Sequence, residues 1–351
     1  MNFEGVEKIA AAILYEGYIL YPYRATAIKN RQRWNFGTLY PRVYAEAQRP
    51  EEPFRLIAEC LVVAGVQASL DARLSFLQLM RQKEAEDKLT DPSLAWDEAV
   101  ERASEHSLQL KDLLTSPLSL TVKMETAGPS TTLRSGRDDK FVASHLLTPQ
   151  ENLASRPERS AVEGPAVNQD LQIALTISAQ MLEDGACKLR IEVQNTTPLT
   201  SGAGAKREEA LPLSLVSAHL VLGITNGEFV SLLDPAEEYR ASAAACSNTG
   251  VFPVLAGEEP DRSMLLCSPI ILYDYPKIAP ESAGDFFDGT EMDEMLTLRV
   301  LTLTDAEKEE MRNGDPRARR ILERTENLTD DAMLKAHGVI RGLREIRGDA
   351  S

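Results

Sequence analysis

Short segments in which apolar and polar residues alternate recur along this chain, and they limit the fold more than any other feature. Within Leu70–Leu79, positions 70, 72, 74 and 76 are apolar, and 118–124 (LSLTVKM) repeats the pattern. Residues 188–194 (KLRIEVQ) also have strand character. A period of two is typical of a strand with one buried face. Further runs with strand character lie at 12–23, 54–63, 171–178, 213–225 and 264–273. Short strands separated by turn residues predict an antiparallel sandwich or barrel.

Helical patterns are fewer. Residues 94–104 (LAWDEAVERAS) carry apolar side chains three and four apart, which predicts a helix. Thr304 and Glu307 have the spacing of a capping box, in which the two side chains satisfy free backbone N–H groups at a helix start. Two polar helices are expected to follow, over about 305–323 and 330–347, and Asp315-Pro316 is expected to break the first.

These patterns together predict an α+β, β-rich protein with an antiparallel β-sandwich-like core and a helical C-terminal tail. Three parts are expected: a β-rich part over 1–115, the sandwich-like domain over 116–303, and C-terminal helices over 304–351. Turn-forming residues and polar composition predict long loops at 126–170 and 196–210 within the second part.

The chain is strongly acidic, with a formal net charge of −16 and a pI of about 4.9. Nucleic acids and anionic lipids attract basic surfaces, so neither is an expected partner. No apolar run approaches the roughly 18 residues of a membrane span, and Glu4, Glu7 and Glu16 are unlike a signal peptide, so no membrane insertion is expected. The four cysteines are widely spaced without a CxxC pair, which favours reduced, buried thiols and a cytoplasmic location.

Motifs that define a reaction are missing from the sequence. There is no GxSxG, SxxK, HExxH, GxxxxGK or GxGxxG pattern, so no catalytic residue and no cofactor is predicted. His219 could bind zinc or iron together with Cys246 or Cys267, since imidazole and thiolate suit these metals. Because no metal-ligand spacing is visible, a hydrogen-bonded core histidine and buried thiols are the favoured interpretation.

An acidic loop lies between Lys277 and Arg299, which enclose six carboxylates and no basic residue. Carboxylates can act in acid–base chemistry when burial separates their pKa values, or bind a hard cation such as calcium or magnesium. Acidic residues also gather at helix starts, which favours a solvated loop. The six residues are Glu281, Asp285, Asp288, Glu291, Asp293 and Glu294.

A segment of opposite character spans 17–45, where basic and aromatic residues are interleaved and no acidic residue occurs. Arginine and aromatic side chains form many binding hot spots, so this segment could contact an anionic partner or the chain's own acidic loop. The predicted partner-binding residues are Arg24, Arg31, Arg33, Trp34 and Tyr40 on this side, and Tyr273, Asp274, Asp285, Asp288 and Glu291 on the acidic side.

Four long stretches of sequence carry a family resemblance. They are LYEGYILYPYRATAIKNRQRWNFGTLYP, FPVLAG, SPIILYDYPKIAPESAGDFFDGTEMDEMLTLRVLTLTDAEKEEMR and DPRARRILER. With these stretches the chain resembles a protein family encoded beside nickel–iron hydrogenases of the actinobacterial, high-affinity type. The resemblance spans both ends of the chain and implies a genomic context, and it assigns no catalytic residue.

The expected function is that of a non-enzymatic accessory protein supporting maturation or assembly of a nickel–iron hydrogenase. Its partner would be a hydrogenase subunit or a maturation protein. One alternative is a metal- or carboxylate-dependent hydrolase that uses the acidic region 274–294. Another is a structural scaffold module that packs against partners without a maturation role.

Overall fold

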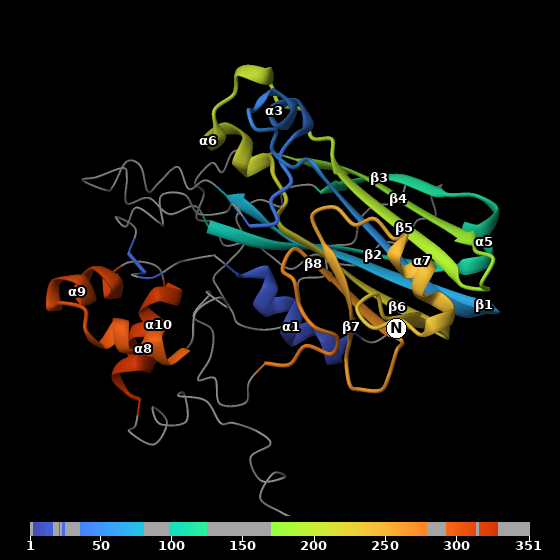
Figure 1. Ribbon diagram of the computed structural model, residues 1–351. Helices are drawn as coiled ribbons and strands as arrows, with labels where there is room; N and C mark the ends of the chain where they lie inside the picture. Colours follow the sequence, from blue (N-terminus) through green and yellow to red (C-terminus); the bar gives the residue numbers. More distant parts are fainter. Residues whose placement is uncertain are drawn as a thin grey trace, which may run out of the picture. The chain divides into compact units, whose positions relative to one another are not determined.

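The computed structural model describes residues 3–16, 21, 23–24, 36–80, 98–124, 170–278, 293–313 and 316–328 (Figure 1). Its contacts divide the chain into two units. Unit 1 comprises 1–14 and 34–276, and unit 2 comprises 15–33 and 277–351. We expected divisions after residues 115 and 303 instead. Strands from both sides of residue 115 pair within unit 1, because one sheet runs through it.

Unit 1 is built on a single antiparallel sheet of eight strands. Seven follow the order β3-β4-β5-β1-β6-β8-β7, and β2 also pairs with β1. We expected the two sheets of a sandwich, but the described strands hydrogen-bond into one curved, nearly closed, barrel-like sheet (Figure 1). The strands are β1 (Arg55–Met80), β2 (Glu98–Gln109), β3 (Leu118–Met124), β4 (Leu171–Met181), β5 (Cys187–Asn195), β6 (Val216–Val230), β7 (Phe252–Ala256) and β8 (Met264–Ser268).

Strand β1 holds the sheet together because it is long enough to serve three partners. Its first part pairs with β5 over 55–62, its middle with β6 over 61–77, and its last part with β2 over 69–80. The register with β6 shifts between Ala64 and Ser69, a bulge-like irregularity of the kind that bends a strand. The separate strands predicted at 54–63 and 70–79 are therefore one continuous strand.

The core lies on the concave side of the sheet. Alternate residues of β1, β4, β5 and β6 point into it, and those of β1 are at positions 56, 58, 60, 62, 68, 70, 72, 74 and 76. Helix α5 (Leu110–Thr115) joins β2 to β3 and inserts Leu110 and Leu113 into this core. The alternation predicted at 118–124 is confirmed in β3, and the strands predicted at 171–178 and 188–194 are confirmed as β4 and β5.

Helix α1 (Glu4–Leu14) covers the outer face of β6, β7 and β8. Its Val6 and Ile13 pack against Val221, Val254 and Leu266. The prediction of strand character at 12–23 was wrong for 12–14, which end this helix. Apolar residues at positions 6, 9, 10 and 13 have the helical spacing that places them on one face.

The end of the sheet opposite α5 carries short helices (Figure 1). They are α3 (Arg42–Ala47), η2 (Gly202–Gly204), α6 (Arg207–Ala210) and η3 (Leu211–Leu213). Fully buried Asn195 connects them to the strands, because its Nδ2 donates to the carbonyls of Leu39 at 2.9 Å and Leu213 at 2.8 Å. Its Oδ1 accepts the Thr197 N–H at 3.0 Å.

The predicted helix at 94–104 was wrong, because the described part of this range belongs to β2 and pairs with β1 from Met80 to Ser69. Three successive inward positions of β2 are Arg102, Ser104 and His106, all buried and all polar, and only Leu108 further along this face is known to pack on the core. A face with three successive polar residues gives a weak period-two signal in hydrophobicity. The alanines and glutamates of the segment then favoured a helix by propensity.

Unit 2 contains three described helices, which are α8 (Asp293–Leu301), α9 (Asp305–Asn313) and α10 (Pro316–Glu326). Helices α9 and α10 occupy the range predicted for the first C-terminal helix, whereas α8 was not predicted. The capping box is confirmed: Thr304 N donates to Glu307 Oε2 at 2.9 Å, and Glu307 N donates to Thr304 Oγ1 at 3.3 Å. The break predicted at Asp315-Pro316 is also confirmed, since α10 begins at Pro316, where a missing N–H costs nothing. The helix predicted at 330–347 lies outside the described residues.

Candidate functional site

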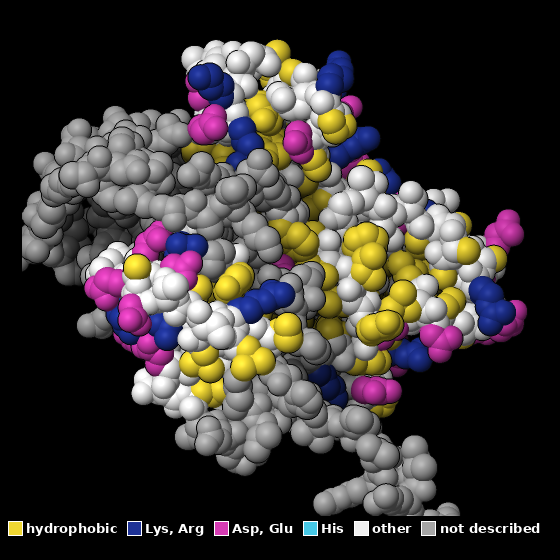
Figure 2. All heavy atoms as spheres, turned by 60° about the vertical axis from the view of Figure 1, so that its left-hand side comes forward, with side chains coloured by type: hydrophobic (Ala, Val, Ile, Leu, Met, Phe, Trp, Pro, Cys, Tyr) yellow, Lys and Arg dark blue, Asp and Glu magenta, His cyan; other side chains and the backbone are white. Residues whose placement is uncertain are grey.

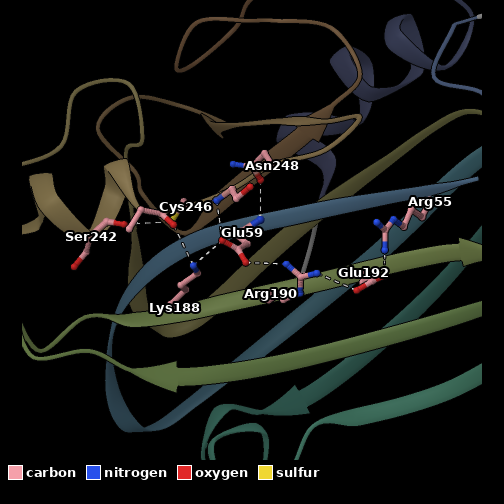
Figure 3. A network of polar contacts seen from close by, with 10 residues as sticks. Arg55, Glu59, Lys188, Arg190, Glu192, Ser242, Cys246 and Asn248 are labelled. Carbon is pink, nitrogen blue, oxygen red and sulfur yellow. Dashed lines mark hydrogen bonds and ion pairs between the residues drawn. The ribbon is translucent and has the colours of Figure 1, made fainter. Parts of the chain in front are cut away.

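The largest polar network in the described part of unit 1 centres on Glu59, on the outer face of the sheet (Figure 3). Odd-numbered residues of β1 point outward, opposite to the core positions. The antiparallel register places Arg190 of β5 directly across from Glu59, and Lys188 two pairs further along on the same face. Charged residues of two strands thereby meet beneath the segment that follows α7 (Arg240–Ala244).

Both carboxylate oxygens of Glu59 are occupied. Arg190 Nη1 lies 2.9 Å from Oε1, and Lys188 Nζ lies 2.6 Å from Oε2. The backbone N–H of Ser247 also donates to Oε2, at 2.7 Å. In return the Glu59 N–H donates to Asn248 Oδ1 at 2.7 Å, so this side chain and backbone together fix the 247–248 segment against the sheet.

The carboxylate of Glu59 is an ionised anchor. Burial by itself would raise its pKa, but the hydrogen bonds from Lys188, the Ser247 N–H and Arg190 outweigh burial and hold the pKa below its ordinary value. A carboxylate that is ionised and fully hydrogen-bonded has no free lone pair facing a substrate. The geometry therefore suits attachment of the 240–249 segment, which covers Leu61 and Val230 with Ala243.

The three weak metal-ligand candidates, His219, Cys246 and Cys267, do not have the properties of a metal site. His219 is buried, and its Nδ1 donates to the Ser217 carbonyl at 2.9 Å, while burial lowers its pKa to about 4. Burial raises the pKa of the Cys246 and Cys267 thiols, which disfavours the thiolate that binds zinc. Among the described residues, no group of three or more His, Cys, Asp or Glu is placed to hold a metal ion.

The four cysteines are free thiols, as predicted, and three of them are buried. They are nevertheless close in space: the buried thiol of Cys60 has its pKa raised first by burial, and the neighbouring Cys267, Cys246 and Cys187 raise it further. Residues spread over more than 200 positions are brought together because β1, β5 and β8 share one core. Sequence spacing gave no signal of this cluster.

Tyr273 and Asp274 lie in a segment after β8, residues 268–278, which we call the post-β8 segment. Asp274 Oδ1 accepts the Leu255 N–H at 2.8 Å, and Oδ2 accepts the Ser231 hydroxyl at 2.5 Å. The Tyr275 N–H donates to the Leu255 carbonyl at 2.7 Å. Tyr273 itself points into water, with 87% of its side chain exposed.

These contacts close the outer edge of β7. Leu255 directs its N–H and its carbonyl away from β8, and both are bonded to the post-β8 segment. Pro253, two residues earlier on the same edge, has no N–H to offer. An exposed strand edge is a template for unwanted pairing, and here a carboxylate and a proline remove its donors.

Of the five residues predicted on the basic side, Arg24 and Tyr40 lie in the described part of the chain. Tyr40 is buried, with Arg207 Nε 3.2 Å from its hydroxyl, and burial raises its pKa. Within unit 2, Arg24 binds α9 through Glu307 at 3.0 Å and Glu310 at 3.4 Å. Arg31, Arg33 and Trp34, like Asp285, Asp288 and Glu291, lie outside the described residues.

Arg24 of the basic segment thus has acidic partners within the chain, on helix α9, which we did not predict as its partner. We paired it with the 274–294 region, but the described contacts of Arg24 go to α9, whose sequence DAEKEEMRN is rich in glutamate. Acidic and basic side chains are intermixed over the C-terminal helices (Figure 2), and Arg312 of α9 binds Glu326 of α10 at 2.8 Å. Charges on this unit are largely paired with one another.

A second buried polar group, missed from sequence, lies at the far end of β1. Arg102 Nε donates to Gln78 Oε1 at 3.0 Å, and Ser104 Oγ lies 2.8 Å from His106 Nε2. Burial lowers the pKa of the Arg102 guanidinium. Burying a guanidinium is costly unless it is well bonded, so this group contributes to specifying the β1–β2 register.

Comparison with known proteins adds no assignment. No model of a known protein family matches the sequence, and no curated protein matches it. Among the described helices, none combines the length and the apolar character that crossing a bilayer requires.

Proposed function

We propose that this chain is a non-enzymatic accessory protein that supports maturation or assembly of a nickel–iron hydrogenase through protein–protein contacts. The observation that carries the proposal is the exposure of two large apolar side chains on the post-β8 segment. Ile271 is 72% exposed and Tyr273 is 87% exposed. Both lie within the longest stretch of the hydrogenase-associated resemblance, 268–312.

The post-β8 segment holds these side chains in a fixed position. Ile270 and Leu272 pack inward on the cluster beneath α1, and Ser268 Oγ donates to the Ile270 carbonyl at 2.8 Å. Asp274, the residue after Tyr273, fastens the segment to β7 by accepting the Leu255 N–H. Binding loses less conformational entropy when the contact residues are already ordered, and tyrosine is a frequent hot-spot residue. A rigid segment presenting Ile271 and Tyr273 supports a binding function.

The polar residues support the same reading. The charged groups that we singled out in the described residues are engaged internally: Glu59 by two cations, Asp274 by a hydroxyl and a backbone N–H, and Arg24 by two carboxylates. These arrangements stabilise the fold and leave the apolar side chains of the post-β8 segment as the group best placed to meet a partner.

Affinity purification from a host that carries the hydrogenase genes tests the proposal. The tagged chain is expected to retain a hydrogenase subunit or a maturation protein, and the double variant Ile271→Ser/Tyr273→Ser is expected to lose it. Met181→Ser is the matched control, because Met181 is 53% exposed on β4, away from the segment. Recovery of no hydrogenase-related protein with the wild-type chain would count against the proposal.

Deletion of the gene separates a maturation role from scaffolding. Loss of hydrogenase activity with an unprocessed large subunit supports maturation. Intact processing with lost assembly of the complex supports a scaffold. Normal activity and normal assembly after deletion contradict both.

A further inference from the structure

The backbone of the post-β8 segment is unpaired where its apolar side chains are exposed. In the described part of the chain, no hydrogen bond involves the backbone of Ile271, Leu272 or Tyr273. The residues on either side are bonded: Ile270 to the Ser268 hydroxyl, and Tyr275 to the Leu255 carbonyl. Three consecutive residues thus have backbone groups without a hydrogen-bond partner among the described residues, and alternate ones point to the same edge.

Burial along this stretch alternates as it does along a strand. Ile270 and Leu272 pack inward, whereas Ile271 and Tyr273 are exposed. Successive side chains on opposite sides indicate an extended backbone, whose N–H and C=O groups point sideways in the plane of pairing. The stretch is short and bordered by bonded residues, so its direction is fixed on both sides.

We propose that an extended segment of a partner protein adds alongside residues 271–273 and pairs with their backbone. This inference rests on the proposed function and specifies how the partner binds. Strand addition draws affinity from main-chain hydrogen bonds and specificity from alternate side chains. Apolar side chains on one face of the added strand would lie beside Ile271 and Tyr273, as cross-strand pairs do in a sheet.

The charges near the segment favour a basic partner strand over a second copy of this chain. The turn between β7 and β8 carries exposed Glu258, Glu259 and Asp261 against one cation, Arg262. This turn lies close to the end of the segment, since the Tyr275 N–H is bonded to the carbonyl of Leu255, two residues before the turn begins. Two chains of net charge −16 repel each other, whereas lysines or arginines on the added strand would meet this turn favourably.

Labelled peptides test the pairing directly. The probe is an eight-residue peptide of alternating valine and lysine with blocked ends, titrated against the full chain by fluorescence anisotropy. Two derivatives carry N-methyl groups either on all valines or on all lysines, because alternate N–H groups of a strand point to opposite edges. We expect one derivative to bind at least tenfold more weakly. Retention of binding within threefold by both derivatives overturns strand addition.

A glutamate-for-lysine version of the peptide tests the charge argument. We expect it to bind at least tenfold more weakly than the lysine peptide, and equal binding overturns the assignment of a basic partner. Ile271→Ser and Tyr273→Ser should each weaken the lysine peptide about tenfold, whereas Met181→Ser should leave its binding unchanged. Sedimentation of the full chain as a dimer that the same two variants dissociate would assign the segment to a second copy instead.

The two proposals fail separately. If the lysine peptide binds with sensitivity to N-methylation but no hydrogenase-related protein is retained from the host, strand addition stands and the proposed function fails. If a hydrogenase subunit is retained and Ile271→Ser/Tyr273→Ser does not release it, the function stands and strand addition fails.

Discussion

Replacement of Glu59 by glutamine tests whether an ionised carboxylate fastens the 240–249 segment to the sheet. Glutamine keeps the shape and one acceptor oxygen, but it places an NH2 group where Lys188 or Arg190 now donates. Glu59 has 8% of its side chain exposed, so water does not replace what is lost.

The magnitude follows from the two ionic contacts, at 2.6 Å and 2.9 Å. Hydrogen bonds to charged groups contribute about 1.5–3 kcal/mol each, and breaking a buried ion pair costs about 3–5 kcal/mol. The cations are 22% and 38% exposed and can turn toward water, which places the cost at the lower end. We expect Glu59→Gln to lower the free energy of unfolding by about 3 kcal/mol at pH 7.

The pH dependence has a definite sign. The native pKa of Glu59 lies below its ordinary value of 4.5, so the stabilisation is complete above pH 4.5 and is lost as the pH falls through the native pKa. The difference in unfolding free energy between wild type and Glu59→Gln should therefore be constant near neutrality and shrink below pH 4.5.

Urea unfolding provides the global measurement, and hydrogen exchange of residues 240–249 reports whether this segment opens first. Glu46→Gln serves as the control, because Glu46 forms an exposed pair with Arg42 on α3 and should change stability by less than about 1 kcal/mol. A loss below 1 kcal/mol for Glu59→Gln, or a difference that persists unchanged at pH 3, would refute the anchoring role.

Three further predictions concern other buried polar groups of unit 1. Asn195→Asp replaces the NH2 group that donates to two carbonyls by an acceptor oxygen. We expect it to lower the free energy of unfolding by about 3 kcal/mol in urea titrations at pH 7. A loss under about 1 kcal/mol contradicts the role of Asn195 in joining the short helices to the strands. His219 has its native pKa lowered to about 4, so wild-type stability should fall as the pH drops from 6.5 toward 4, and His219→Asn should remove that slope in thermal unfolding. Asp274→Ala frees the Leu255 N–H at the edge of β7 and should increase self-association in light scattering, whereas an unchanged monomer contradicts edge protection.

The sheet strands were predictable where burial differs between the two faces. Alternation at 118–124 identified β3 to the residue, and strand character at 171–178 and 188–194 located the ends of β4 and β5 to within three residues. Strand β2 was not predicted because three of its inward residues, Arg102, Ser104 and His106, are polar. The period-two pattern of hydrophobicity is therefore weak in this strand. The continuity of β1 across residue 65 could not be predicted either, because its bulge interrupts the pattern at the point where the partner strand changes.

The candidate site was predictable in part. The sequence singled out Tyr273 as a contact residue, which stays a prediction. The internal bonds of Asp274 depend on Ser231 and Leu255, which no local pattern links to it. The Glu59 network was missed for the same reason. Its members come from β1, β5 and a loop up to 189 positions away, so only the sheet register brings them together.

The length of β1 has a consequence for how this chain folds as the ribosome releases it. Hairpin β1–β2 can form early, but the edge of β1 that pairs with β6 stays incomplete until Val230 has emerged, about 150 residues after Met80. At about 5–20 residues per second, that interval lasts roughly 8–30 s. Throughout it, the longest of the described strands exposes an open edge to other nascent chains. Chaperone dependence during synthesis should therefore be set by β1 and should decline once β6 has been made.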